Sequence, residues 1–206
     1  MPILHHTKTH ERFFFIHIPR TAGRFLMENF IENGYNVEHH LTNKILKKEK
    51  EITDYLWTPT EGVEISHATY PLYNKWKSVK GLTSIAIIRN PIDRFFSSSF
   101  SFTKKFNQSS FEDWTSFKDI LSTYKSITNW WRPQHEFISP YTRIWKYENG
   151  FGEKFCNWIN TILPINFSIK TKTYSKVNDN KPQLVKTKAL INNIKKFYHK
   201  DFEDFD

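Results

Sequence analysis

Two short segments combine arginine with small or hydroxylated residues in a pattern that suits the binding of anions. The first is Pro19-Arg20-Thr21-Ala22-Gly23-Arg24, and the second runs from Arg89 through Asn90-Pro91 to Ser97. An arginine presents a planar fork of donors that fits a phosphate or sulfate group, and a serine hydroxyl can add one more hydrogen bond. Two such segments predict a ligand that carries anionic groups at two ends.

Both segments lie where a predicted strand passes into a predicted helix. Phe13–Ile18 is a short apolar run typical of an interior strand, and the helical periodicity of Arg24–Asn33 follows it. Residues 82–88 predict a central strand, after which Asn90 suits a helix N-cap and Pro91 a first helical position. We expect backbone N–H groups and helix dipoles to point at the bound charge, with both junctions at one edge of a parallel sheet.

A plain connection between a strand and a helix, with two solvated arginines, is the alternative interpretation of the first segment. The segment is not a Walker A loop, because the spacing of two glycines followed by Lys and Ser or Thr is missing. The second basic junction favours the anion-binding interpretation.

The composition predicts one folded α/β domain with a central parallel sheet flanked by helices. The 206 residues are 38% hydrophobic and 25% charged, which suffices for a sizeable core. We expect a single domain over residues 1–206, of which 1–11 are flexible. The formal net charge of +9 favours an anionic partner.

Several classes of protein are disfavoured by the same composition. The single cysteine, Cys156, excludes an internal disulfide framework and a cysteine-rich zinc site. No apolar run approaches the roughly 18 residues of a membrane span, and the polar, histidine-rich N-terminus does not read as a signal peptide. The sequence therefore predicts a soluble, cytoplasmic protein without an integral membrane segment.

His67 is the leading candidate for a proton-transfer group. It follows a short predicted strand over residues 63–66, where open α/β sheets place their chemistry. A histidine on a surface loop is an equally good interpretation of this pattern taken alone. Further helices are predicted over residues 71–79, 91–105, 111–124, 151–163 and 184–198, and a loop over residues 168–182.

An aromatic and basic cluster lies between these helices, formed by Trp130, Trp131, Arg132 and His135. Helix packing is one interpretation of the cluster. The other is a stacking and anion-binding platform for an acceptor sugar, which would make Trp131, Arg132 and His135 substrate-binding residues.

The two basic segments together resemble the cofactor motifs of the sulfotransferases that use 3′-phosphoadenosine 5′-phosphosulfate (PAPS), most closely the carbohydrate branch that acts on heparan and chondroitin. The resemblance covers about residues 12–205. Further similarity is carried by Trp131-Arg132-Pro133-Gln134, by Ile144-Trp145-Lys146-Tyr147-Glu148-Asn149 and by Tyr198-His199-Lys200-Asp201-Phe202-Glu203. The family fold would make the chain a P-loop-like three-layer sandwich.

The resemblance implies a PAPS site. In the family the first motif cradles the 5′-phosphosulfate, and the second binds the 3′-phosphate through its first arginine and its serine. In relatives a late loop closes over the nucleotide, which makes Lys176, Asn178 and Lys181 candidates, while a merely solvated loop is the other interpretation of each. The implied cofactor-binding residues are Arg20, Thr21, Ala22, Gly23, Arg24, Arg89, Ser97, Lys176 and Asn178.

The first motif departs from the family at two positions. Arg20 stands where the family has a lysine that contacts the transferring sulfonate, and Arg24 stands where it has Thr or Ser. Arginine stabilises charge but is a poor proton donor, because it keeps its proton at all ordinary pH values. These differences bear on the transfer rate more than on cofactor binding.

Sulfuryl transfer of this kind is an in-line displacement that requires no metal. The resemblance implies Arg20 and the amides of residues 21–24 as the electrostatic stabilisers of the reacting group, and His67 as the base, because histidine titrates near neutrality. Glu64 and His17 are the reserve candidates for the base. The acceptor is a hydroxyl group, for which a glycan is favoured, while a peptide tyrosine or a small alcohol stays open.

Three other functions remain open on the sequence. A P-loop-type kinase would need magnesium ligands and a Lys-Ser/Thr pair at the basic turn, and neither is found there. A nucleic-acid or polyanion binder fits the net charge, but no RNP-like, zinc-finger or helix-turn-helix signature is present, so no nucleic-acid partner is expected. A catalytically impaired, nucleotide-binding relative is compatible with Arg20 and Arg24.

Overall fold

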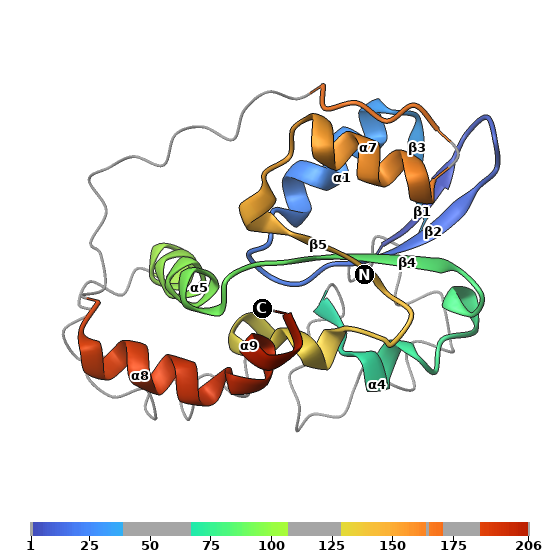
Figure 1. The fold of residues 1–206 in the computed structure, drawn as a ribbon. Coiled ribbons are helices and arrows are strands. Elements are labelled where there is room, and N and C mark those ends of the chain that lie inside the picture. The colour runs from blue at the N-terminus through green and yellow to red at the C-terminus, as the bar shows by residue number, and fades with distance from the viewer. Residues whose placement is uncertain (1, 39–66, 107–128, 164, 171–185, 206) are drawn as a thin grey trace.

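The computed structural model describes residues 2–38, 67–106, 129–163, 165–170 and 186–205 of the 206-residue chain. Its centre is a five-stranded sheet with the strand order β3-β1-β2-β4-β5. The strands are β1 (Ile3–His6), β2 (Arg12–Ile16), β3 (Tyr35–Glu38), β4 (Thr83–Ile88) and β5 (Arg143–Lys146). Figure 1 shows helices above and below this sheet, which confirms the predicted α/β class.

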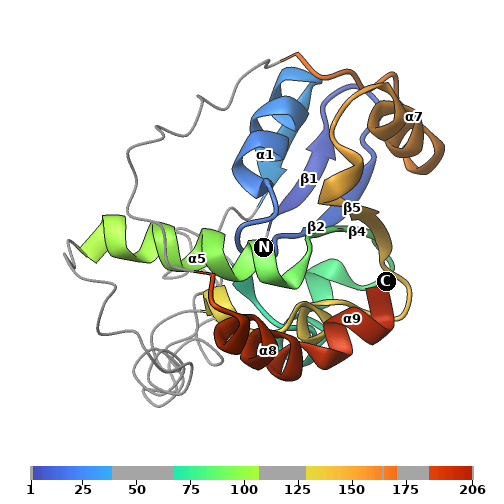
Figure 2. The same cartoon turned by 60° about the vertical axis from the view of Figure 1, so that its left-hand side comes forward.

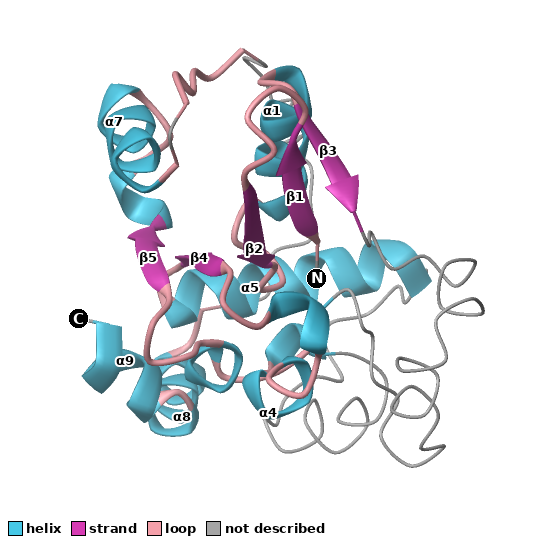
Figure 3. Cartoon of the chain, turned by 90° about the vertical axis from the view of Figure 1, so that its right-hand side faces the viewer, coloured by secondary structure: helices cyan, strands magenta, loops and turns pink. Residues whose placement is uncertain are grey.

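The sheet is mixed, which corrects the expectation of a purely parallel one. Strands β2, β4 and β5 are parallel neighbours, with Ile16 opposite Ala86 and Ile88 opposite Lys146. Strand β1 is antiparallel to both β2 and β3 (Figure 3). The predicted parallel arrangement therefore holds for β2 and β4, which lead to the two basic junctions, and for β5 beside β4.

The expectation that residues 1–11 are flexible is wrong for β1. Ile3 pairs with Phe14 on one side and Glu38 on the other, and both Ile3 and Leu4 are buried. The sequence signal was weak because only two apolar residues stand together in a polar, histidine-rich segment.

Both faces of the sheet are buried, as expected of strands covered by helices on each side. On one face Phe13 and Phe15 pack with residues of α1 (Gly23–Glu32) and α7 (Glu153–Ile162). On the other face Phe14 and Ile16 pack with α4 (Tyr70–Tyr73) and the 3-10 helix η4 (Gln134–Phe137). Because successive side chains of β2 point to opposite faces of the sheet, they contribute to two separate hydrophobic cores.

The expected helices over 24–33, 91–105 and 151–163 correspond to α1, α5 (Pro91–Phe106) and α7. The start of α5 is the predicted one, because the Asn90 Oδ1 accepts hydrogen bonds from the Ile92 N–H at 3.0 Å and the Asp93 N–H at 3.3 Å. This cap fixes where the strand β4 passes into the helix.

One expected helix is divided, and the helix expected over 184–198 is followed by a further one. The segment 71–79 forms α4 and then the 3-10 helix η2 (Lys77–Val79), because Trp76 between them is extended and packs into the core. The last helix is α8 (Lys188–Phe197), followed by α9 (His199–Phe205). The chain turns at Tyr198, whose buried hydroxyl donates to the Trp131 carbonyl at 2.6 Å.

Several of the predicted elements and residues fall outside the part of the chain that the structure describes. The predicted strand over 63–66 and the predicted helix over 111–124 lie outside the described residues, as do Glu64, Lys176, Asn178 and Lys181.

The layer below the sheet is joined to it through Arg94 of α5, which is 1% exposed. Its guanidinium donates hydrogen bonds to the carbonyls of Pro19, at 3.5 Å, Trp130, at 3.1 Å, and Arg132. The group lies 5.6 Å from the ring of Tyr198, at the end of α8, and Figure 2 shows α8 beside α5. Burial lowers the pKa of Arg94, while the neighbouring Tyr198 and Asp201 oppose this shift.

We predict that Arg94→Met lowers the free energy of unfolding by about 3 kcal/mol, because buried carbonyls lose a charged donor. Urea denaturation followed by tryptophan fluorescence measures the effect. The matched control is Arg143→Met at an exposed position of β5, which should change stability by less than about 0.5 kcal/mol. Similar losses in both variants would contradict the bridging role of Arg94.

Candidate active site

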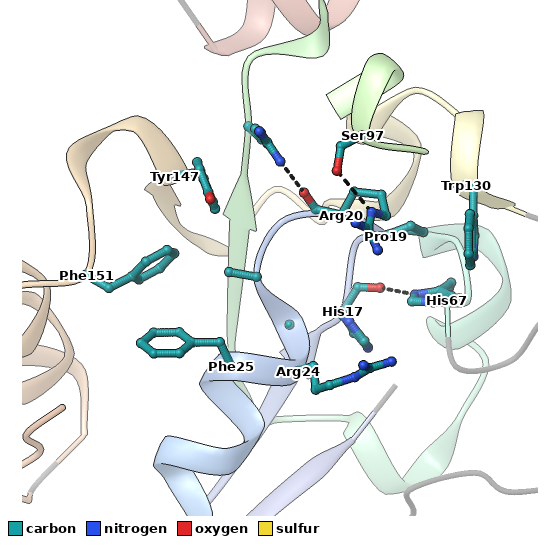
Figure 4. Close-up of a pocket in the computed structure, with 13 residues that line it drawn as sticks. His17, Pro19, Arg20, Arg24, Phe25, His67, Ser97, Trp130, Tyr147 and Phe151 are labelled. Atoms are coloured by element: carbon teal, nitrogen blue, oxygen red, sulfur yellow. Dashed lines mark hydrogen bonds between the residues drawn. The ribbon is translucent and has the colours of Figure 1, made fainter. Parts of the chain in front are cut away.

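A pocket of about 530 Å³ opens where β2 and β4 end (Figure 4). Residues from both strand–helix junctions line it together, as the parallel pairing of β2 and β4 requires. Arginines and histidines are prominent among the described lining residues, and none of these residues is acidic. The pocket therefore carries a positive potential that suits an anionic ligand. Its lining is formed by His17, Pro19, Arg20, Ala22, Gly23, Arg24, Phe25, His67, Arg89, Ser97, Trp130, Tyr147 and Phe151.

The turn between β2 and α1 forms one wall of the pocket. Arg20 and Ala22 adopt left-handed backbone conformations, with φ of 68° and 70°, which cost free energy in residues other than glycine. Thr21 is fully buried, and its hydroxyl donates to the Ile18 carbonyl at 2.9 Å. The Thr21 side chain therefore stabilises the turn, and only its backbone could serve a ligand.

Helix α1 begins at the pocket with features that favour an anion. Its N-cap is Ala22, which has no side-chain oxygen to bind the first N–H groups, and its first turn contains no acidic residue. The N–H groups of such a helix start and the positive end of its dipole are suited to a phosphate or sulfate.

Gly23 is required by a neighbouring side chain. A Cβ atom at this position would lie 1.9 Å from Nε2 of His17. The missing side chain of Gly23 thus leaves the space that the imidazole ring of His17 occupies.

Arg20, Arg89 and Ser97 meet in this pocket. The Arg20 Nε donates to the Ser97 Oγ at 3.1 Å, and an Nη of Arg89 donates to the Arg20 carbonyl at 3.3 Å. The Arg89 guanidinium also lies 4.4 Å from the centre of the Tyr147 ring, and that of Arg20 lies 6.0 Å from the ring of Trp130. The carbonyl and aromatic faces thus help to hold two cations close together.

His67 is held in one orientation at the other side of the pocket. Its Nδ1 lies 2.7 Å from the His17 carbonyl oxygen, and its ring packs edge-on against the His17 ring with centroids 4.5 Å apart. Because a carbonyl only accepts, Nδ1 carries the proton, and in the neutral ring Nε2 keeps its lone pair. The arrangement can therefore accept a proton at Nε2. Asn129 donates to the His67 carbonyl at 2.7 Å and fixes the backbone there.

The three residues expected to bind the acceptor do not line the pocket. Trp131 is buried and donates from Nε1 to Ser99, Arg132 pairs with Glu136 at 2.9 Å, and His135 contacts Asp201 at 2.8 Å. These contacts within the protein agree with the interpretation that the cluster serves helix packing. Trp130 lines the pocket instead.

An aromatic wall, formed by Phe25, Tyr147 and Phe151, was not anticipated. The ring centroids of Phe25 and Phe151 are 5.5 Å apart, and those of Tyr147 and Phe151 are 5.6 Å apart. Figure 4 shows this wall on the side of the pocket away from His67 and Trp130. The available signals were the position of Phe25 directly after the first motif and of Tyr147 in the segment 144–149 that carries further similarity to the family.

The described residues contain no group of three or more His, Cys, Asp or Glu side chains arranged to hold a metal ion. No helix among them has the length and apolar content that crossing a membrane demands.

Comparison with known proteins gives one match. The model of the sulfotransferase family matches residues 6–206, which include both basic junctions and every described residue that lines the pocket. No curated protein and no solved structure matches the sequence. Because the match extends over nearly the whole chain, this protein belongs to the sulfotransferase family.

Proposed function

We propose that this protein is a PAPS-dependent sulfotransferase that moves the sulfuryl group to a hydroxyl of a carbohydrate acceptor. The observation that carries the proposal is the meeting of Arg20, Arg89 and Ser97 in one pocket without acidic lining residues. A ligand with two separated anionic groups fits such a pocket, and the family match supports sulfuryl transfer as its chemistry. Residues 1–206 would then form a single domain in which β2, the turn and α1 act as a P-loop-like element.

The residues present suit such a nucleotide. Arg89 has a buried Nε without a hydrogen-bond partner among the described residues, so its guanidinium can still bind an anion, and we assign it with Ser97 to the 3′-phosphate. The backbone N–H groups of residues 21–24 would hold the 5′-phosphosulfate at the start of α1, whereas the Arg24 side chain extends toward the side of the pocket that contains His67. The aromatic wall offers a stacking surface for the adenine base.

PAPS would supply a sulfuryl group whose sulfur forms a bond to the acceptor oxygen as its bond to the phosphate oxygen breaks. Nε2 of His67 takes the proton of the acceptor hydroxyl, and the His17 carbonyl stabilises the resulting imidazolium through Nδ1. Arg20 places positive charge against the sulfonate and the leaving phosphate, although it donates no proton. The products are a sulfate ester and adenosine 3′,5′-bisphosphate.

We propose that the acceptor binds at the side of the pocket that contains His67. Trp130 lines that side and could stack on a sugar ring, in the role that the sequence suggested for Trp131. Figure 4 shows Arg24 extending past His17 on the same side. An aromatic face and a cation near the proposed base are together suited to a sugar that carries acidic groups.

We predict that Arg89→Ala weakens binding of adenosine 3′,5′-bisphosphate by about 10- to 100-fold, because a charge-assisted hydrogen bond to the 3′-phosphate is lost. Binding of adenosine 5′-phosphate should change by less than about threefold. Isothermal titration calorimetry measures both affinities, with Arg143→Ala at the exposed first position of β5 as the control. An equal loss for the two nucleotides would reject the assignment of Arg89.

We predict that His67→Asn leaves the affinity for adenosine 3′,5′-bisphosphate unchanged but lowers turnover by about 100-fold or more, because Asn can donate to the His17 carbonyl yet cannot act as the base. The assay follows labelled sulfate from PAPS to heparan and chondroitin chains. His199→Asn on α9 is the control histidine. Normal turnover in His67→Asn would remove His67 from this role, and wild-type protein that binds the nucleotide but sulfates no polysaccharide would contradict a carbohydrate acceptor.

A further inference from the structure

The backbone of Arg89 is held by the side chain of Gln134. The Gln134 Oε1 accepts from the Arg89 N–H at 2.9 Å, and its Nε2 donates to the Arg89 carbonyl at 2.8 Å. Strand β4 ends one residue earlier, where Ile88 pairs with Lys146. Gln134 therefore satisfies both backbone groups of Arg89 just beyond the end of the strand, with a side chain that is itself 1% exposed.

Gln134 is in turn held by Asp201 of the C-terminal helix α9. One carboxylate oxygen accepts from the Gln134 N–H at 2.8 Å, and the other lies 2.9 Å from the His135 N–H and 2.8 Å from its Nδ1. Asp201 is 1% exposed. A buried carboxylate that accepts several N–H bonds is a rigid anchor, because any movement leaves charge and donors unsatisfied.

The residue after Arg89 is fixed in a similar way from the 3-10 helix η5 (Tyr147–Asn149), which follows β5. The Glu148 Oε1 accepts from the Asn90 N–H at 2.6 Å. The neighbouring Tyr147 makes a cation–π contact between its ring and the Arg89 guanidinium. Three segments that are distant in the sequence thus converge on the end of β4. Each of them belongs to a motif that the sequence presented only as a supporting similarity.

We propose that Gln134 and Asp201 are positioning residues for Arg89, through which helix α9 controls recognition of the nucleotide 3′-phosphate; this inference rests on the proposed function. An arginine side chain has many rotamers, and its guanidinium can meet a phosphate at a defined place only if its backbone is fixed. Displacing a binding group by about 1 Å is enough to cost much of its interaction. Purely structural residues at these positions would affect stability but not the choice between nucleotides.

The test is the ratio of the affinities for adenosine 3′,5′-bisphosphate and adenosine 5′-phosphate in Gln134→Met. Met has a similar length and removes both hydrogen bonds to the Arg89 backbone. We expect the ratio to fall about tenfold, with the 5′-phosphate bound as in the wild type. Asp201→Asn, which keeps the shape but turns an N–H toward one of the donors, should lower the ratio in the same direction and serves if Gln134→Met does not fold.

The matched control is Tyr73→Phe. It removes a buried hydrogen bond of 2.8 Å to the Phe137 carbonyl at the other end of η4, so it should lower the melting temperature without changing the ratio. A wild-type ratio in folded Gln134→Met and Asp201→Asn would overturn this inference alone, provided that the wild type prefers the bisphosphate. Wild-type protein without that preference would contradict the proposed function, and this inference with it.

Discussion

The buried guanidinium of Arg94 is the interaction on which the arrangement of the site depends. It donates to the carbonyls of two residues that line the pocket, Pro19 in the first basic turn and Trp130 in η3 (Asn129–Trp131). A charge removed from water is costly unless its donors are used, so these carbonyls and the Tyr198 ring must stay where they are. The position of the turn relative to α5 and α8 follows from that requirement.

The pocket itself concentrates positive charge. The Arg89 guanidinium donates to the backbone carbonyl of Arg20, so the two arginines are close together. Arg24 extends from the same turn as Arg20. Like charges at short range raise the free energy of the empty site, and this cost is offset in part by the aromatic rings of Trp130 and Tyr147. The left-handed conformations of Arg20 and Ala22 add strain at the same place. A bound polyanion would relieve the repulsion, which is a physical reason for strong and selective nucleotide binding.

Much of the secondary structure was predictable because its causes are local. The apolar runs before Arg20 and Arg89 form β2 and β4, and the Asn90 side chain caps α5 as its residue type suggests. Strand β1 escaped prediction because Ile3 and Leu4 are too short a run to be distinguished from a polar terminus, and pairing with two neighbours provides what the local pattern lacks. The break between α8 and α9 depends on the burial of Tyr198, which no periodicity reveals.

The site was predictable in its charged groups but not in its walls. The sequence alone predicted that the two basic junctions lie at one edge of the sheet, because parallel strands with helical crossovers have their carboxyl ends on the same side. Only the tertiary structure decided that Trp130 rather than Trp131 faces the pocket, since neighbours in a 3-10 helix point about 120° apart and packing selects which is buried. The tertiary structure also determines that Gln134 binds the backbone of Arg89. These residues are 45 positions apart, so their contact depends on how the layers pack and cannot be predicted from local sequence patterns.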